Sequence, residues 1–167
     1  MSFDLKKKVI IVTGGASGIG KHVVQKLLEA NAQPVVADLN VKTGDQQDGA
    51  LCVQCNVTDP DSVNAMVQTV VDTYGKVDGL VNNAGINKPR LLVDVKGEHP
   101  EYELDLKTLD QMFAVNVKGL FLCAQAVARR LIPQGHGVII NMSSESGKEG
   151  SQGQSAYSAT KGACDSF

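Results

Sequence analysis

Short apolar runs alternate with longer segments whose apolar residues recur at helical spacing. Strands are predicted at residues 8–13, 34–38, 50–56, 77–82 and 137–142. Helices are predicted at residues 19–30, from Asp59 and Pro60 onward, at 104–132, and from Gln154 to the end. A polar stretch at residues 86–103 interrupts this order and is longer than most strand-to-helix connections. Strands separated by helices predict an α/β fold with a Rossmann-type, doubly wound parallel sheet.

Composition and charge narrow the class of protein. Hydrophobic residues make up 43% of the 167 residues and charged residues 20%, which is typical of one soluble globular domain. The net charge of −2 gives no reason to expect a nucleic acid or an anionic membrane as a partner. Apolar runs such as residues 9–12 are too short to span a bilayer. We therefore expect a cytoplasmic protein.

The chain has four cysteines, and Cys52 and Cys55 form a C-x-x-C pair. Such a pair can bind a metal or carry redox chemistry, but no second Cys or His pair lies at ligand spacing. In a strand, residues three apart face opposite sides of the sheet. The sequence therefore favours buried thiols and no metal site.

A glycine-rich turn follows the first predicted strand. Glycine permits positive φ and lets a pyrophosphate approach the backbone, and the next helix offers free N–H groups to the phosphates. We therefore expect a dinucleotide to bind at this turn, through Gly14, Ser17, Gly18, Ile19 and Gly20.

An acidic residue ends the second predicted strand. Asp38 lies where a carboxylate can accept hydrogen bonds from both hydroxyls of an adenosine ribose and repel a 2′-phosphate. The turn from Gly14 to Gly20 has no basic residue that would attract such a phosphate. The sequence therefore predicts NAD as the cofactor, although a helix-capping aspartate is the structural alternative.

The ordered set of motifs resembles the short-chain dehydrogenase/reductase family. It consists of T-G-x-x-x-G-I-G from Thr13, N-N-A-G from Asn82, Asn116, Ser144, and Y-x-x-x-K from Tyr157. The resemblance implies that Asn116, Ser144, Tyr157 and Lys161 are catalytic, with Asn116 anchoring a water molecule in a proton relay. It also implies further cofactor contacts from Asn56, Val57, Asn83, Ala84, Gly85, Tyr157 and Lys161. Asn56 stands where the family often has aspartate.

Oxidation of an alcohol by NAD needs a base for the hydroxyl proton. Tyr157 and Lys161 are four residues apart on a predicted helix and so share a face. A free phenol ionises near pH 10, and an ammonium about 4.5 Å away favours the phenolate by on the order of 3–4 kcal/mol at an effective dielectric constant near 20. Ser144 can hydrogen-bond the reacting oxygen; Ser143 is the alternative, with a less typical interval to Tyr157.

Two polar segments are predicted to face the substrate. They contain Lys88, Arg90, Glu145 and Lys148, and they resemble the branch of the family that oxidises sorbitol 6-phosphate to fructose 6-phosphate. The cations are candidate phosphate contacts and Glu145 a candidate partner for hydroxyls, unless these are merely solvated loop charges. The alternatives are a 3-oxoacyl carrier-protein reductase and a noncatalytic NAD-binding sensor.

Family members are longer than this chain. We therefore expect residues 1–167 to form one dinucleotide-binding and catalytic domain, incomplete at its C-terminus, that stops before the last strands and the substrate lid. The complete protein is expected to be a homo-oligomer, a tetramer or a dimer.

Overall fold

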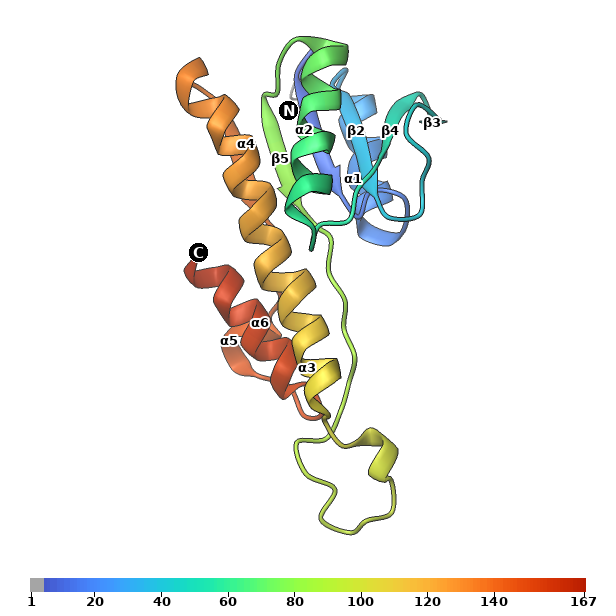
Figure 1. Cartoon of the computed structure of the whole chain (residues 1–167), viewed down its shortest axis with the longest axis vertical. Coiled ribbons are helices and arrows are strands. Elements are labelled where there is room, and N and C mark those ends of the chain that lie inside the picture. Colours follow the sequence, from blue (N-terminus) through green and yellow to red (C-terminus); the bar gives the residue numbers. More distant parts are fainter. Residues whose placement is uncertain (1–4) are drawn as a thin grey trace.

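A computed structural model describes residues 5–167, so the first four residues of the predicted domain lie outside the described part. Its sheet has the strand order β3-β4-β2-β1-β5-β6, of which Figure 1 labels β3, β4, β2 and β5. The strands are β1 (Val9–Thr13), β2 (Gln33–Asp38), β3 (Gln46–Gln47), β4 (Ala50–Gln54), β5 (Gly79–Asn82) and β6 (Val138–Asn141). All pairings are parallel except that of β3 with β4. The predicted α/β fold and its parallel sheet are confirmed.

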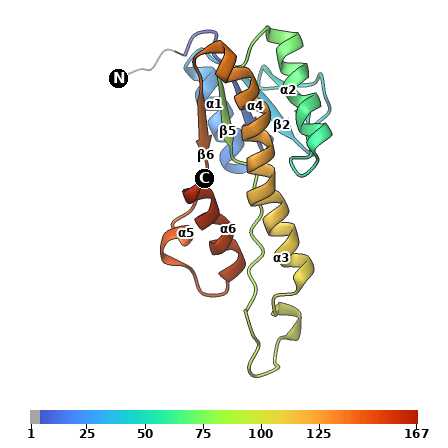
Figure 2. The same cartoon turned by 60° about the vertical axis from the view of Figure 1, so that its left-hand side comes forward.

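Helices cover both faces of this sheet. Helix α1 (Gly18–Glu29) packs on one face, and α2 (Pro60–Tyr74) and α4 (Leu120–Gln134) pack on the other. The remaining helices, α3 (Leu106–Phe113), α5 (Ser146–Glu149) and α6 (Ser155–Ser166), lie away from the sheet. A short 3-10 turn, η1 (Pro100–Tyr102), interrupts the long polar connection after β5. The last two helices lie beside the lower half of the long α3–α4 helix, away from the sheet (Figure 2).

Two apolar clusters hold the helices to the sheet. On one face, alternate residues of β1 and β2 pack with the apolar stripes of α2 and α4, including Val67 and Val127. On the other face, the intervening residues pack with α1, where Val24 is fully buried. Cys52 belongs to the second cluster and Cys55 to the first, as their spacing in a strand predicts. Both are buried free thiols.

The edge strand β6 departs from the expectation that helices cover both faces of every strand. Val138 and Ile140 are 53% and 48% exposed. Within residues 5–167, no helix covers these two side chains. An apolar run therefore identified the strand but not the burial of each of its residues.

The predicted helix at residues 104–132 is confirmed as a continuous helical segment, Leu106–Gln134, with one irregularity. Between α3 and α4 the chain forms wider π-type turns, η2 (Ala114–Gly119), a feature often found at functional sites. The segment is long and apolar enough to cross a membrane by length and composition, since an 18-residue stretch of it has a mean hydropathy of 1.3. Its apolar residues, such as Cys123 and Leu131, instead form a wall of the core.

The hairpin of β3 and β4 was not predicted. Asp48 and Gly49 form its two-residue turn, and both have positive φ, 53° and 92°. Asp-Gly is a strong sequence signal for such a turn. The two-residue strand before it was too short to show a pattern. Helix α5 was missed for the same reason, because it spans only four residues.

Asp78 anchors the amino ends of two neighbouring strands and is only 6% exposed. Its carboxylate accepts a hydrogen bond from the Val9 backbone N–H at 2.9 Å and pairs with Lys8 and Lys76 at 3.2 and 2.7 Å. Burial by itself raises the pKa of Asp78, but the hydrogen bonds from Lys76, Val9 and Lys8 outweigh it and lower the pKa.

We expect Asp78→Asn to lower the free energy of unfolding by about 2 kcal/mol near neutral pH, because it removes a charge from buried partners. A carboxylate with a lowered pKa stabilises the fold above its unfolded-state pKa of about 4, and the effect fades below that. Urea unfolding at about pH 7 and about pH 3.5 checks this. A difference between parent and variant that does not shrink at the lower pH would contradict it.

Candidate functional site

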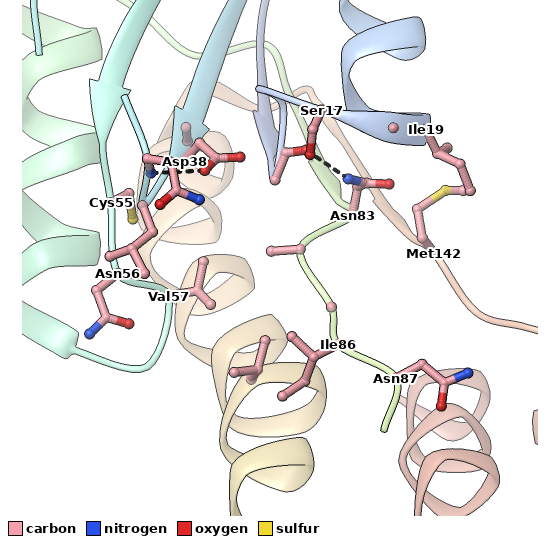
Figure 3. Close-up of a pocket in the computed structure, with 18 of the residues that line it drawn as sticks. Ser17, Ile19, Asp38, Cys55, Asn56, Val57, Asn83, Ile86, Asn87 and Met142 are labelled. Carbon is pink, nitrogen blue, oxygen red and sulfur yellow. Dashed lines mark hydrogen bonds between the residues drawn. The ribbon is translucent and has the colours of Figure 1, made fainter. Parts of the chain in front are cut away.

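A cavity of about 520 Å³ opens at the carboxyl ends of the central strands, the position where open α/β sheets bind ligands. Figure 3 shows Asp38, Cys55, Asn56 and Val57 at one end and Ile86, Asn87 and Met142 toward the other. Most of the sequence-predicted cofactor residues line it: Gly14, Ser17, Gly18, Ile19, Asp38, Asn56, Val57, Asn83, Ala84, Gly85, Tyr157 and Lys161. The fold therefore gathers into one elongated space motifs that are more than 140 positions apart in the sequence.

The glycine turn joins β1 to α1 along the cavity wall. Gly14 and Gly18 have φ of 66° and 51°, values that side chains with a Cβ rarely adopt. Ser17 is the N-cap of α1, but its side chain makes no capping hydrogen bond. The first N–H groups of the helix therefore face the cavity without a side-chain partner, in the arrangement that suits a phosphate.

Gly20 has a different role from its neighbours, because it does not line the cavity. A Cβ on this residue would lie 2.1 Å from the Gly14 carbonyl oxygen and 2.6 Å from the Asn83 side-chain nitrogen. Only glycine lets α1 approach the turn so closely.

Thr13 and Asn83 fasten the turn to the end of β5. The Thr13 hydroxyl accepts hydrogen bonds from the backbone N–H groups of Asn83 and Ala84, both at 3.1 Å. The Asn83 amide donates to the carbonyl oxygens of Thr13 and Gly14 at 3.0 and 3.2 Å. Asn83 thus fixes the backbone of the glycine turn through these two hydrogen bonds. Thr13 was not singled out from the sequence, although its position directly before the glycines was visible.

Asp38 lies at the end of β2 with its carboxylate already oriented. One oxygen accepts from the Ala16 backbone N–H at 3.1 Å and the other from the Asn40 N–H at 3.0 Å. Each carboxylate oxygen can accept two hydrogen bonds, so capacity remains for ribose hydroxyls. The Asp38 carboxylate therefore holds two backbone N–H groups and keeps acceptor capacity for a ligand.

Tyr157 and Lys161 project from α6 into the other end of the cavity. Lys161 is 6% exposed, and its ammonium donates to the Met142 carbonyl oxygen at 2.6 Å. The ammonium nitrogen lies 5.8 Å from the centre of the Tyr157 ring. The two side chains therefore share one wall, and two ammonium donors of Lys161 are left for a ligand.

The two serines after β6 are placed differently. Ser143 lines the cavity, and its hydroxyl donates to the Lys161 backbone carbonyl at 3.1 Å. Ser144 does not line it; its hydroxyl lies 3.0 Å from the Ser146 hydroxyl and accepts from the Ser146 N–H at 3.3 Å. Ser144 is therefore the sequence neighbour of a residue that lines the cavity, and its own hydroxyl is bound to Ser146.

Asn116 is buried within the π-type turns and joins three segments. Its side-chain oxygen accepts from the Ile86 N–H at 2.8 Å, and its nitrogen donates to the Ile86 carbonyl at 2.9 Å and to the Thr160 hydroxyl at 3.0 Å. Thr160 in turn donates to the Tyr157 carbonyl at 2.7 Å. The side chain thus ties the segment after β5 to the helix that carries Tyr157. Thr160, fully buried, had no sequence signal beyond its place before Lys161.

None of the four candidate substrate residues lines the cavity: Lys88, Arg90, Glu145 and Lys148. Lys88 donates to the Gln111 side chain at 2.5 Å. Arg90 lies 5.7 Å from the Tyr102 ring, and its Nε is buried with no partner among the described residues. Glu145 and Lys148 are exposed around α5.

Cys55 lines the cavity, but neither its thiol nor that of Cys123 is suited to chemistry there. Burial raises the pKa of Cys55 to about 11 and that of Cys123 to about 12. Both therefore stay protonated near neutral pH, in a form that neither attacks electrophiles nor binds metal well. Within residues 5–167, no group of three or more His, Cys, Asp or Glu side chains is arranged to hold a metal ion.

Comparison with known proteins agrees with the site. The family described as short chain dehydrogenase matches residues 8–167. A sorbitol-6-phosphate 2-dehydrogenase of Klebsiella pneumoniae is 47% identical over 98% of this chain and 62% of its own length. A 3-oxoacyl-[acyl-carrier-protein] reductase of Synechocystis sp. is 35% identical over 94% of this chain and 64% of its own. The chain thus spans less than two thirds of the length of these relatives.

Proposed function

We propose, for a chain that belongs to the short-chain dehydrogenase family, that the protein transfers hydride between a secondary alcohol and its ketone with NAD as the cofactor. The observation that carries this proposal is the single elongated cavity with Asp38 at one end and Tyr157 and Lys161 at the other. A dinucleotide needs a ribose partner, a phosphate site and a reactive end in that order.

The residues present fit such a cofactor. Asp38 would hold the adenosine ribose, the start of α1 would hold the phosphates, and Lys161 would hold the second ribose. When bound, NAD accepts the hydride from the alcohol carbon. A 2′-phosphate would meet the Asp38 carboxylate at close range, which supports NAD over NADP.

Side chains of the protein would accept the proton of the substrate hydroxyl. Tyr157 would take the hydroxyl proton as the general base, and the nearby Lys161 charge would stabilise the phenolate. Ser144 would donate its hydroxyl hydrogen to the reacting oxygen when the Ser146 hydroxyl is the donor between the two serines. Because both N–H donors of the Asn116 side chain are used, we assign it to positioning α6, and a water anchored there would donate to its side-chain or backbone oxygen.

The substrate we propose is sorbitol 6-phosphate, oxidised to fructose 6-phosphate. The identity to the Klebsiella pneumoniae enzyme and the two cations at Lys88 and Arg90 support it. The alternative is reduction of a 3-oxoacyl carrier-protein thioester, which the Synechocystis relative supports and the Asp38 carboxylate opposes if NADPH is required. A noncatalytic NAD sensor would not need Ser144, Tyr157 and Lys161.

One absorbance assay separates these functions in the complete protein. We expect NADH to form from NAD with sorbitol 6-phosphate and far more slowly with sorbitol. Preferential oxidation of NADPH by a 3-oxoacyl thioester would support the reductase instead. Binding of NADH with no turnover of either substrate would support the sensor.

Asp38 should set the choice of cofactor. We expect Asp38→Ala to lower the ratio of kcat/KM for NAD to that for NADP by about tenfold or more, because it removes both the ribose hydrogen bonds and the repulsion of a 2′-phosphate. Asp72→Ala, on the exposed side of α2, is the control. An unchanged ratio would place cofactor selection in other residues.

We expect Arg90 to bind the substrate phosphate through its guanidinium charge, and its Nε has no hydrogen-bond partner among the described residues. Charge-assisted hydrogen bonds contribute about 1.5–3 kcal/mol, so Arg90→Ala should raise KM for sorbitol 6-phosphate by about ten- to a hundredfold. Any turnover of unphosphorylated sorbitol, and the affinity for NAD, should change little. If alanine at Lys88, Arg90 and Lys148 in turn leaves KM unchanged, the phosphate binds elsewhere.

We also propose a cytoplasmic homo-oligomer. An apolar groove of about 450 Å³ between the π-type turns and α6 supports a second copy as its occupant. Phe113, Phe121 and Phe167 are 39%, 44% and 61% exposed along it. Phe121→Glu should then lower the oligomeric mass measured by light scattering.

A further inference from the structure

The β3–β4 hairpin packs over the glycine turn, and it has no part in the function proposed so far. Its Asp48-Gly49 turn reaches α1, where the Gln25 side chain donates to Asp48 at 3.5 Å. In the strand before that turn, the Gln47 side chain donates to the Gly15 carbonyl oxygen at 3.3 Å. The hairpin therefore contacts both the turn and the helix that would hold the phosphates.

Gln47 and Asp38 hold the same peptide group from its two ends. The carbonyl of Gly15 and the N–H of Ala16 belong to one planar unit. Gln47 donates to that carbonyl, and Asp38 accepts from that N–H at 3.1 Å. Gly15 also lies against β1 and β2, since a Cβ there would be 2.9 Å from the Val12 carbonyl oxygen.

The orientation of the Gly15–Ala16 peptide sets the direction of the backbone N–H groups that follow it. Ser17, Gly18 and Ile19 follow directly and line the cavity at the start of α1. A rotated Gly15–Ala16 peptide would turn their N–H groups away from a bound phosphate. Because the peptide is held in this orientation before the phosphate binds, binding does not have to supply the free energy of ordering the turn.

We infer that Gln47 is a positioning residue for the phosphates of the dinucleotide, acting from the hairpin through the Gly15–Ala16 peptide. This inference rests on the proposed NAD-binding function. Asp38 chooses between the cofactors, whereas Gln47 changes the affinity for both by the same factor, because it touches the turn and not the ribose.

The test compares Gln47→Met and Gln47→Glu with Gln46→Glu in the complete protein. Methionine keeps the length and removes the donor; glutamate also places an acceptor against the Gly15 carbonyl. Gln46, the exposed neighbour in β3, carries the same added charge without touching the turn. We expect the Kd for NADH, from fluorescence titration, to rise about three- to tenfold for Gln47→Met and further for Gln47→Glu. Gln46→Glu should match the parent.

Two further readouts separate positioning from a general loss of structure. KM for NAD should rise while kcat at saturating NAD stays within about twofold, because Tyr157 and Lys161 lie at the far end of the cavity. The ratio of NADH to NADPH affinity should not change. If the parent binds NADH and Gln47→Met binds it equally well, the inference is overturned. If the parent binds no NADH, the proposed function itself fails.

Discussion

Tyr157→Phe should lower kcat by about 10²–10⁴-fold while the Kd for NADH changes by less than about threefold. A positioned general base contributes a factor of this size, and phenylalanine removes the hydroxyl but keeps the ring. The ring lines the cavity beside Lys161, so packing at the reactive end is preserved. Steady-state kinetics with NAD and sorbitol 6-phosphate, together with NADH titration, measure both quantities.

The control for this variant is Tyr74→Phe at the end of α2. Tyr74 packs against the core and is not among the cavity-lining residues. The same atom is removed, and kcat should stay near the parent value. A loss below about tenfold for Tyr157→Phe would mean that another group takes the proton.

Gly20→Ala should weaken NADH binding by about tenfold or more and lower the free energy of unfolding by about 3 kcal/mol. The added methyl group would lie 2.1 Å from the Gly14 carbonyl oxygen, so either α1 or the turn must move. Overpacking of this kind costs about 1–3 kcal/mol, and here the contact is with backbone, which yields least.

Gly75→Ala provides the matched control. Gly75 ends α2 with φ of 75°, and a Cβ there meets nothing within 4 Å. The substitution should cost about 1 kcal/mol from backbone strain alone and leave NADH binding unchanged. If the two variants behave alike in urea unfolding and NADH titration, close helix approach is not what Gly20 provides.

Much of the fold could be predicted because its strands and helices have strong local patterns. The run at β1 is apolar because both of its faces are buried, and the stripe of α2 follows from Val63, Met66, Val67 and Val70 meeting the sheet. Asp59 caps that helix and Pro60 begins it, as predicted. The elements that were missed, β3 and α5, are too short to carry a periodic pattern.

The candidate site was predicted as a set of residues but not as an arrangement. Sequence order placed the glycine turn and Asp38 at the ends of the first two strands, which parallel pairing brings to one edge, and placed the Tyr157–Lys161 pair on the last helix. It favoured Ser144 over Ser143, whereas Ser143 is the one that lines the cavity, and it gave no sign that Gly20 would pack against the turn. Those outcomes depend on side-chain directions set by neighbouring segments.

The sequence by itself determined the parallel α/β fold, the cofactor-type turn and the chemistry available at its edge, because periodicity, glycine positions and residue types are local properties. Only the tertiary structure decided which polar groups are free to act. Asn116 lies in a helix pattern that predicts nothing of its three side-chain hydrogen bonds, and Gln47 reaches Gly15 across 32 positions. Such contacts join segments that are distant in the sequence, and hydrogen bonds of this kind produce no periodic pattern of residues along the chain.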